Sequence, residues 1–207
     1  QESGVAIDMP AGPSEVCVLA DETCNPGFVA SDLLSQAEHG PDSQVLLVST
    51  SSKVVDEINE ALTAQLAVLP RKDIAQQALE NSKAIVVDSM EQAIFIVNSY
   101  AAEHLIIACK NDEVIGEQIT NAGSVFLGNY SPESVGDYAS GTNHTLPTSG
   151  YARAYSGVSV DSFVKKITYQ KLTPAGLQAI GAAVETMAAA EGLDAHKNAI
   201  TIRLQTL

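Results

Sequence analysis

The chain has 207 residues, of which 45% are hydrophobic and 17% charged, and its formal net charge at pH 7 is −14. This length and apolar content predict a compact globular protein with a substantial core and argue against a disordered chain. The acidic balance, with no cluster of lysine and arginine, excludes nucleic acid as an expected partner. No apolar run is long enough for a membrane span, and the N-terminus has no signal-peptide pattern, so no membrane association is expected.

The three cysteines, Cys17, Cys24 and Cys109, are odd in number and have no CxxC spacing. They predict reduced thiols and a cytoplasmic location. The sequence begins without methionine and leads at once into an apolar run. We therefore expect it to come from the middle of a longer protein, as a fragment or a processed product.

Short apolar runs alternate with helical patterns through the first two thirds of the chain. Strands are predicted at residues 16–20, 45–48, 84–87, 105–107 and 124–127. Helices are predicted at 26–39, from about 54 to 70, and at 71–81, 91–99 and 114–120. Asn25 is expected to cap the first helix, with Pro26 in its first turn. Because the strands are continuously apolar, they predict an α/β domain whose parallel sheet is covered on both faces.

Residues 128–157 lose this pattern and are rich in Ser, Gly, Thr, Asn, Pro and Tyr. Loops of this length in compact domains are usually functional or disordered, and the Asp and His of this one favour function. Thr173 and Pro174 then start a long helix, Gly192 ends it, and Asp194 is expected to cap a final helix. We therefore expect a sheet domain over residues 1–158, with an active-site loop at 128–157, and a small helical subdomain over 159–207.

None of the four histidines lies inside an apolar run, and at such positions a ring nitrogen can meet a ligand, a metal or a proton. Gln36 and His39 share one helix face near its end. They fit either a metal site or a polar last turn. Glu103 beside His104 fits either proton transfer near neutral pH or a surface dipeptide.

The other two histidines have acidic neighbours in less regular sequence. Asp137 and His144 share the long loop, where a functional and a solvated reading both remain open. Glu191 and His196 flank the turn at Gly192, where helix-end charges are commonly solvated. The chain has no G-x-G-x-x-G, no P-loop and no G-x-S-x-G. The residue pattern alone therefore predicts an enzyme-like α/β domain with a histidine and carboxylate site.

Six strings of residues are more specific than this spacing, and they resemble those of the histidinol dehydrogenase family. They occur in the family's order along nearly the whole chain: AGPSEV at 11–16, DLLSQAEHG at 32–40, EHL at 103–105, AGSVFLG at 122–128, GDYASGTNH at 136–144 and AHKNA at 195–199. The match corresponds to the C-terminal half of a typical member. It implies an incomplete Rossmann-like sheet domain followed by helices.

The resemblance also implies an activity and its cofactors. Family enzymes oxidise L-histidinol to L-histidine through a bound aldehyde, in two NAD-linked steps at the end of histidine biosynthesis. They are homodimers with a zinc site shared between subunits. The N-terminal half, which supplies most of the NAD contacts, is missing from this sequence.

Roles are implied residue by residue. Zn²⁺ is expected on Gln36, His39, Asp137 and His196, the last contributed by the partner subunit. Glu103 and His104 are expected to form the acid/base pair. The remaining substrate contacts, beside His104 and the metal ligands, are expected from Ser14, His144 and Glu191.

Two alternatives remain open. A relative in the same superfamily could oxidise another polar alcohol, such as a sulfonated diol, although an anionic substrate would not favour the carboxylate of Glu191. Alternatively, the chain could be a zinc-binding, dimerising fragment without a working nicotinamide site, and so not an enzyme.

Overall fold

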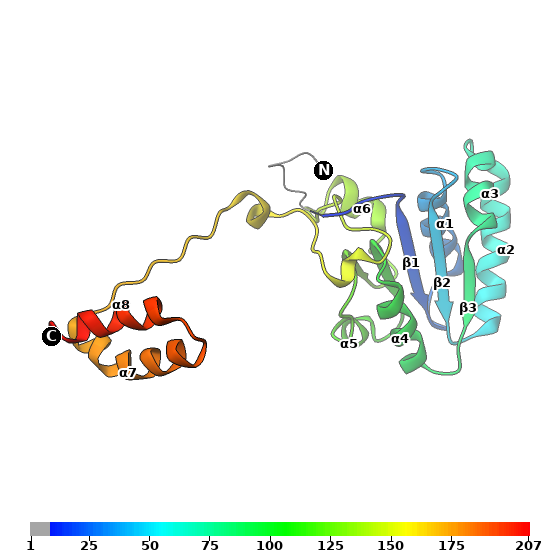
Figure 1. The fold of residues 1–207 in the computed structure, drawn as a ribbon. Helices are drawn as coiled ribbons and strands as arrows, with labels where there is room; N and C mark the ends of the chain where they lie inside the picture. Colours follow the sequence, from blue (N-terminus) through cyan, green and yellow to red (C-terminus); the bar gives the residue numbers. More distant parts are fainter. Residues whose placement is uncertain (1–8) are drawn as a thin grey trace. The chain divides into compact units, whose positions relative to one another are not determined.

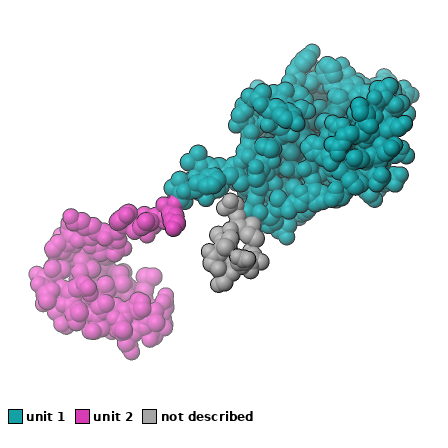
Figure 2. Space-filling model, turned by 90° about the horizontal axis from the view of Figure 1, so that it is seen from above, with its two compact units in different colours: residues 1–164 teal, residues 165–207 magenta. Residues whose placement is uncertain are grey.

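The computed structural model describes residues 9–207 and divides the chain into two compact units, residues 1–164 and residues 165–207 (Figures 1 and 2). Each unit is described here by itself.

The first unit is built on a sheet of five parallel strands. These are β1 (Glu15–Ala20), β2 (Gln44–Ser49), β3 (Lys83–Val86), β4 (His104–Ala108) and β5 (Ser124–Leu127), in the order β3-β2-β1-β4-β5. This is the strand order of a doubly wound Rossmann-like sheet, without a sixth strand in the described part of the chain. The predicted α/β class and parallel sheet are confirmed.

Helices cover both faces of the sheet, as Figure 1 shows. One face carries α1 (Pro26–Ala37), α2 (Ser52–Val68) and α3 (Lys72–Glu80), and the other carries α4 (Met90–Tyr100) and α5 (Asp112–Gly116). Alternate residues of β1 enter different cores: Val16 and Val18 pack on the α1 side, and Cys17 and Leu19 on the α4 side. A strand that is buried on both faces must be apolar at every position, which explains the continuous runs.

The predicted start of the first helix is confirmed. The Asn25 side-chain oxygen accepts hydrogen bonds from the backbone N–H groups of Gly27 and Phe28, and Pro26 occupies the first turn. Because α1 follows β1 and returns across the sheet, its last turn lies at the edge where the parallel strands begin (Figure 1).

Three local predictions differ from the structure. The helix expected at 114–120 ends at Gly116, because the Asn98 side chain accepts hydrogen bonds from the N–H groups of Thr120 and Asn121 and fixes this stretch outside a helix. The loop at 128–157 contains α6 (Glu133–Tyr138) and a 3₁₀ turn at Tyr151–Arg153. Asp194 does not cap the final helix but is its first residue.

A second 3₁₀ turn, at Val160–Phe163, lies near the end of the first unit. The second unit is a helical hairpin of α7 (Pro174–Ala190) and α8 (Asp194–Leu204). Gly181 allows the two helices to approach closely, because a Cβ at this position would lie 2.7 Å from the Leu204 side chain. The apolar residues of α7 are only partly covered: Ile180 and Met187 are exposed.

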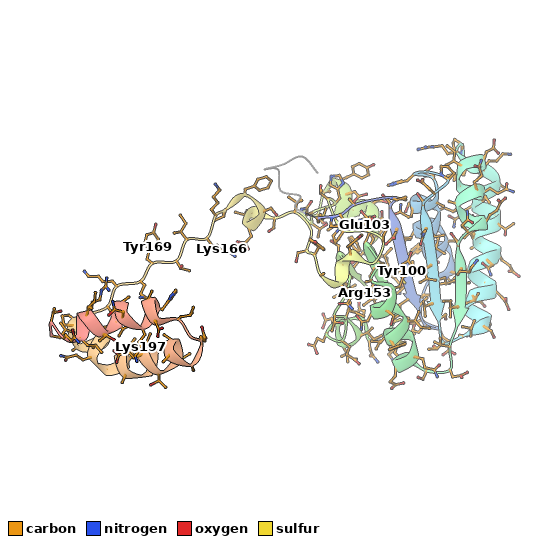
Figure 3. The ribbon with its side chains drawn as sticks, in the orientation of Figure 1. Tyr100, Glu103, Arg153, Lys166, Tyr169 and Lys197 are labelled. Carbon is orange, nitrogen blue, oxygen red and sulfur yellow. The ribbon has the colours of Figure 1, made fainter. Side chains whose placement is uncertain are left out.

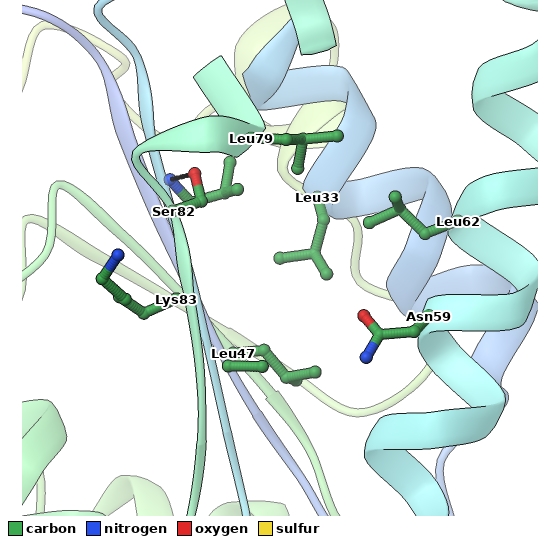
Figure 4. A pocket seen from close by; sticks show the side chains of 9 residues that line it. Leu33, Leu47, Asn59, Leu62, Leu79, Ser82 and Lys83 are labelled. Atoms are coloured by element: carbon green, nitrogen blue, oxygen red, sulfur yellow. Dashed lines mark hydrogen bonds between the residues drawn. The ribbon is translucent and has the colours of Figure 1, made fainter. Parts of the chain in front are cut away.

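Two further features complete the description. A cavity of about 200 Å³ opens between the sheet and helices α1, α2 and α3 (Figure 4), lined by Leu33, Val45, Leu47, Asn59, Leu62, Leu79, Ser82, Lys83 and Ala84. It contains none of the site residues expected from the sequence. Among the described residues, no helix is long and apolar enough to cross a membrane.

Candidate active site at the amino ends of β1 and β4

Two adjacent strands begin with the residues expected to transfer protons. In the pairing of β1 with β4, Val16 lies opposite His104, so that Glu15 and Glu103 immediately precede this pair. Glu103 and His104 are 5% and 4% exposed. The dipeptide is therefore buried at the edge of the sheet and is not a surface feature.

Two tight backbone features fix the position of Glu103. Helix α4 ends at Ala101, a non-glycine residue in the left-handed region at φ 57°, which turns the chain into β4 within three residues. Gly123 lies against the Glu103 carbonyl, where a Cβ would come within 2.5 Å of the carbonyl oxygen. Only glycine permits this approach, so the AGS sequence before β5 serves to position Glu103.

The two ring nitrogens of His104 have different surroundings. Nδ1 lies 3.2 Å from the main-chain oxygen of Glu15, which can only accept a hydrogen bond, so this contact favours a proton on Nδ1. Nε2 is buried, has no hydrogen-bond partner among residues 9–207, and lies 4.0 Å from the Asp137 carboxylate. Burial lowers the pKa of His104 and outweighs the hydrogen bond with the Glu15 backbone and the charge of Asp137, which both raise it. Nε2 of a neutral His104 is therefore available as a base.

Several carboxyl groups surround this imidazole. Glu103 Oε2 accepts a hydrogen bond of 2.9 Å from the Glu15 N–H, and Glu133 Oε1 lies 3.5 Å from His104 Nδ1. Burial, together with the charge of Asp137, raises the pKa of Glu103 to about 7 and that of Glu133 to about 8. This cluster gathers acidic groups in a poorly solvated place, and a cation bound there would offset their charge.

The long loop is tied to the same edge of the sheet at two points. The Ser149 N–H donates a 2.8 Å hydrogen bond to Glu15 Oε1. The guanidinium of Arg153 donates to the main-chain oxygen of Ser99 at the end of α4, close to Tyr100 (Figure 3). The loop is thus held against the residues that precede β4, and Glu103 is labelled nearby in the same figure.

The last turn of α1 supplies Gln36 and His39. Gln36 is fully buried, and neither of its side-chain atoms has a hydrogen-bond partner among the described residues. A buried amide without partners costs free energy on the order of 1–3 kcal/mol, so its side chain calls for a partner such as a metal ion or water. His39 is exposed just beyond the helix.

The remaining predicted residues are distributed as follows. Ser14 is partly buried before β1, and His144 is exposed in the loop. Asp137 lies in α6 and faces His104 Nε2. Glu191 and His196 are exposed residues of the second unit, so the geometry of the first unit includes neither.

Three acidic residues of this pocket were not singled out as site residues from the sequence: Glu15, Asp32 and Glu133. His104, Glu133 and Asp137 offer ligand atoms within 4.8 Å of one another, a spacing compatible with a metal ion. One signal was present, because Pro132 starts a helix whose first residue is Glu133 and whose fifth is Asp137, on the same face.

We expect Asp32→Asn to stabilise the metal-free chain more at about pH 7.5 than at about pH 4. Burial raises the pKa of Asp32 to about 6, so the folded state binds this proton more tightly than the unfolded state. Stability is therefore lost as the pH rises from the ordinary value of an aspartate through about 6, and asparagine removes that loss. Thermal unfolding at both pH values measures the effect.

Asp56→Asn is the matched control, because Asp56 is an exposed residue in the second turn of α2. It should change the melting temperature little at either pH. An equal gain for Asp32→Asn at both pH values would contradict the buried, destabilising carboxylate.

The opposite edge of the sheet, at the carboxyl ends of the strands, is where a dinucleotide would be expected to bind. In doubly wound folds a dinucleotide binds beyond the carboxyl ends of the strands, at a glycine-rich turn after β1. Here that turn starts at Asp21, whose carboxylate accepts hydrogen bonds from the N–H groups of Thr23 and Lys110. An anion in this crevice would meet a carboxylate, so these residues do not fit the phosphates of NAD.

The chain is similar to known proteins along almost its whole length. The family model of histidinol dehydrogenase matches residues 1–204. Histidinol dehydrogenase of Bacteroides thetaiotaomicron is 63% identical over 203 residues, which are 98% of this chain and 47% of that protein. Histidinol dehydrogenase of Aliivibrio fischeri is 57% identical over 204 residues, covering 99% of this chain and 46% of that protein.

The fold agrees with these sequence matches. The crystal structure of histidinol dehydrogenase from Elizabethkingia anophelis has 62% sequence identity and a TM-score of 0.95, and the match covers 98% of this chain and 47% of that one. The chain thus spans about half the length of the relatives it matches. Sequence and fold together confirm the resemblance: the chain belongs to the histidinol dehydrogenase family.

Proposed function

We propose that this chain supplies the metal, substrate and proton-transfer residues of an L-histidinol dehydrogenase. The reaction is the oxidation of L-histidinol through L-histidinaldehyde to L-histidine, an oxidoreductase step of histidine biosynthesis. The observation that carries the proposal is the buried, unpartnered Nε2 of His104, which lies 4.0 Å from Asp137 in an acidic pocket. No group among the described residues donates a proton to this nitrogen, so we propose that it accepts the proton of the substrate hydroxyl.

Zinc fits the residues proposed to hold it. Gln36, His39, Asp137 and His196 offer an amide oxygen, two imidazole nitrogens and a carboxylate oxygen, which is an oxygen and nitrogen set that Zn²⁺ accepts. The buried Gln36 amide, with no protein partner among residues 9–207, supports this assignment. The metal would serve to orient and polarise the polar groups of the substrate.

His104 and Glu103 would divide the proton transfers. His104 Nε2 takes the proton of the carbinol hydroxyl as the alcohol is oxidised, because Nδ1 is committed to the Glu15 carbonyl. Glu103 then takes a proton from the water that attacks the aldehyde. Its pKa, raised to about 7 by burial, is close to that of an effective base at neutral pH.

The charge of the pocket supports a cationic substrate. Histidinol carries an ammonium group, and the carboxyls around His104 would offset that charge. Ser14, His144 and Glu191 are the proposed additional contacts, with Glu191 suited to the amine. An anionic substrate such as a sulfonated diol would meet net repulsion here, which argues against that alternative.

NAD would be held outside this chain. The turn after β1 does not fit a dinucleotide, and the chain covers about half of its relatives' length. We therefore propose that NAD, the hydride acceptor, is bound by residues that this sequence does not contain.

A homodimer would complete the metal site with His196 of the second copy. The helical hairpin of the second unit supports this, because Ile180, Met187 and Ile202 are exposed apolar side chains. Apolar residues gathered on one small unit are typical of a surface that another subunit covers.

Calorimetric titration of this chain with L-histidinol, with and without Zn²⁺, tests the proposal. We expect binding that depends on zinc and is lost in Gln36→Ala. A folded, zinc-loaded chain that binds a sulfonated diol and ignores L-histidinol would contradict the substrate. A chain that takes up zinc but binds neither alcohol would favour the non-catalytic fragment.

A further inference from the structure

Glu133 is a buried carboxyl that the proposed reaction does not use. Its side chain is 3% exposed, and Oε1 lies 3.5 Å from His104 Nδ1. Oε2 is buried without a hydrogen-bond partner among residues 9–207. A buried carboxyl with one unsatisfied oxygen does not stabilise the fold, so we expect Glu133 to have a functional role.

We propose that Glu133 is a positioning residue, which keeps the proton of His104 on Nδ1 and so leaves the Nε2 lone pair directed at the substrate pocket. This inference deepens the proposed function and rests on it for the role of His104 as the base. The tautomer itself is a property of the chain alone.

In the metal-free chain, two carboxyl groups favour opposite positions for the single proton of the neutral ring. Asp137 lies 4.0 Å from Nε2 and would favour the proton there, which would remove the base. At Nδ1, the Glu15 carbonyl at 3.2 Å and Glu133 Oε1 at 3.5 Å favour the opposite tautomer. In the absence of Glu133, one neutral carbonyl would have to outweigh a carboxylate.

Glu103, the third neighbour of Nδ1, cannot replace Glu133 in this role. Glu103 Oε2 lies 3.7 Å from Nδ1, but it already accepts a 2.9 Å hydrogen bond from the Glu15 N–H. While Nδ1 carries its proton, it faces Glu133 Oε1 as a donor, so a proton on Glu133 would reside on Oε2 and leave Oε1 free to accept. Glu133 therefore acts in either protonation state.

The position of Glu133 is itself well defined. It is the first residue of α6, and Asp137 lies one turn further on the same helix. Gly136, between them, packs against the Phe126 ring, where a Cβ would lie 2.6 Å from the ring edge. Helix α6 is thus held against Phe126 of β5 and places one carboxyl group near each ring nitrogen of His104.

The test is the ¹⁵N spectrum of the imidazole rings in the metal-free chain, in which protonated and unprotonated ring nitrogens have distinct shifts. The His104 signals are those missing in His104→Asn. We expect a protonated Nδ1 in the wild type and in Glu133→Gln, whose amide oxygen can still accept. Glu133→Ala should shift the population toward a protonated Nε2, and Ser134→Ala, an exposed neighbour on α6, should not.

The catalytic consequence is measured in a protein of the relatives' full length. Glu133→Ala should lower kcat about 10- to 100-fold with little change in KM, the size of effect seen when a carboxylate that orients a metal-ligating histidine is removed. Glu133→Gln should retain most of the rate.

The outcomes separate the two proposals. An unchanged Nδ1 tautomer in Glu133→Ala would overturn this inference, whatever the substrate. A shifted tautomer in a chain that never binds L-histidinol would support the positioning role of Glu133 and contradict the proposed substrate.

Discussion

His104→Asn is expected to lower the turnover of L-histidinol by about 10²- to 10⁴-fold while zinc remains bound. Asparagine can keep an N–H near the Nδ1 position, so the contact with the Glu15 carbonyl survives. It has no atom at Nε2, and the proton of the substrate hydroxyl then has no acceptor. Steady-state kinetics in a protein of the relatives' length, together with zinc content by atomic emission, measures both effects.

The zinc measurement distinguishes a base from a ligand. His104, Glu133 and Asp137 could themselves hold a metal, since their ligand atoms lie within 4.8 Å of one another. If His104→Asn lost its zinc, His104 would be a metal ligand and the assignment of the base would be wrong. A melting temperature close to that of the wild type is the control for folding.

A mixed dimer of His39→Ala and His196→Ala subunits is expected to regain one of its two zinc sites. If each site takes Gln36, His39 and Asp137 from one subunit and His196 from the other, one site of the mixed dimer carries both substitutions. The other site carries neither. Either homodimer, in contrast, carries one substitution in every site and should bind zinc weakly.

Random mixing of equal amounts makes half of all dimers mixed, so about a quarter of the wild-type zinc sites and activity should return. Zinc content and turnover of the separately purified parents and of the unfolded and refolded mixture measure this recovery. No recovery beyond the sum of the parents would show that the four ligands come from one subunit, and would contradict the shared site.

Much of the fold could be predicted from the sequence because its cause is local or periodic. Strands buried on both faces must be apolar at each position, and β1, β2 and β4 were found for this reason. Capping chemistry is local too, so Asn25 and Pro26 located the start of α1. The resemblance to the family, carried by six short strings, also came from the sequence and is confirmed by the comparisons.

The predictions that failed depended on distant residues. The helix predicted from 114 to 120 ends at Gly116, because the side chain of Asn98 accepts a hydrogen bond from the N–H of Thr120, 22 residues further along the chain. Helix α6 was missed because six residues carry too little periodicity to reveal a helix in a polar segment.

The environment of the candidate site was decided by the tertiary structure alone. The sequence placed Glu103 beside His104, but spacing alone favoured a surface dipeptide over an acid/base pair. Only the pairing of β1 with β4 buries both residues and places the Glu15 carbonyl on Nδ1. Asp137 and Glu133 reach the two nitrogens of that ring from a helix about 30 residues further along the chain. Residue type and order are written in the sequence, whereas burial, the tautomer and the competition between carboxyls arise from contacts between segments that only folding brings together.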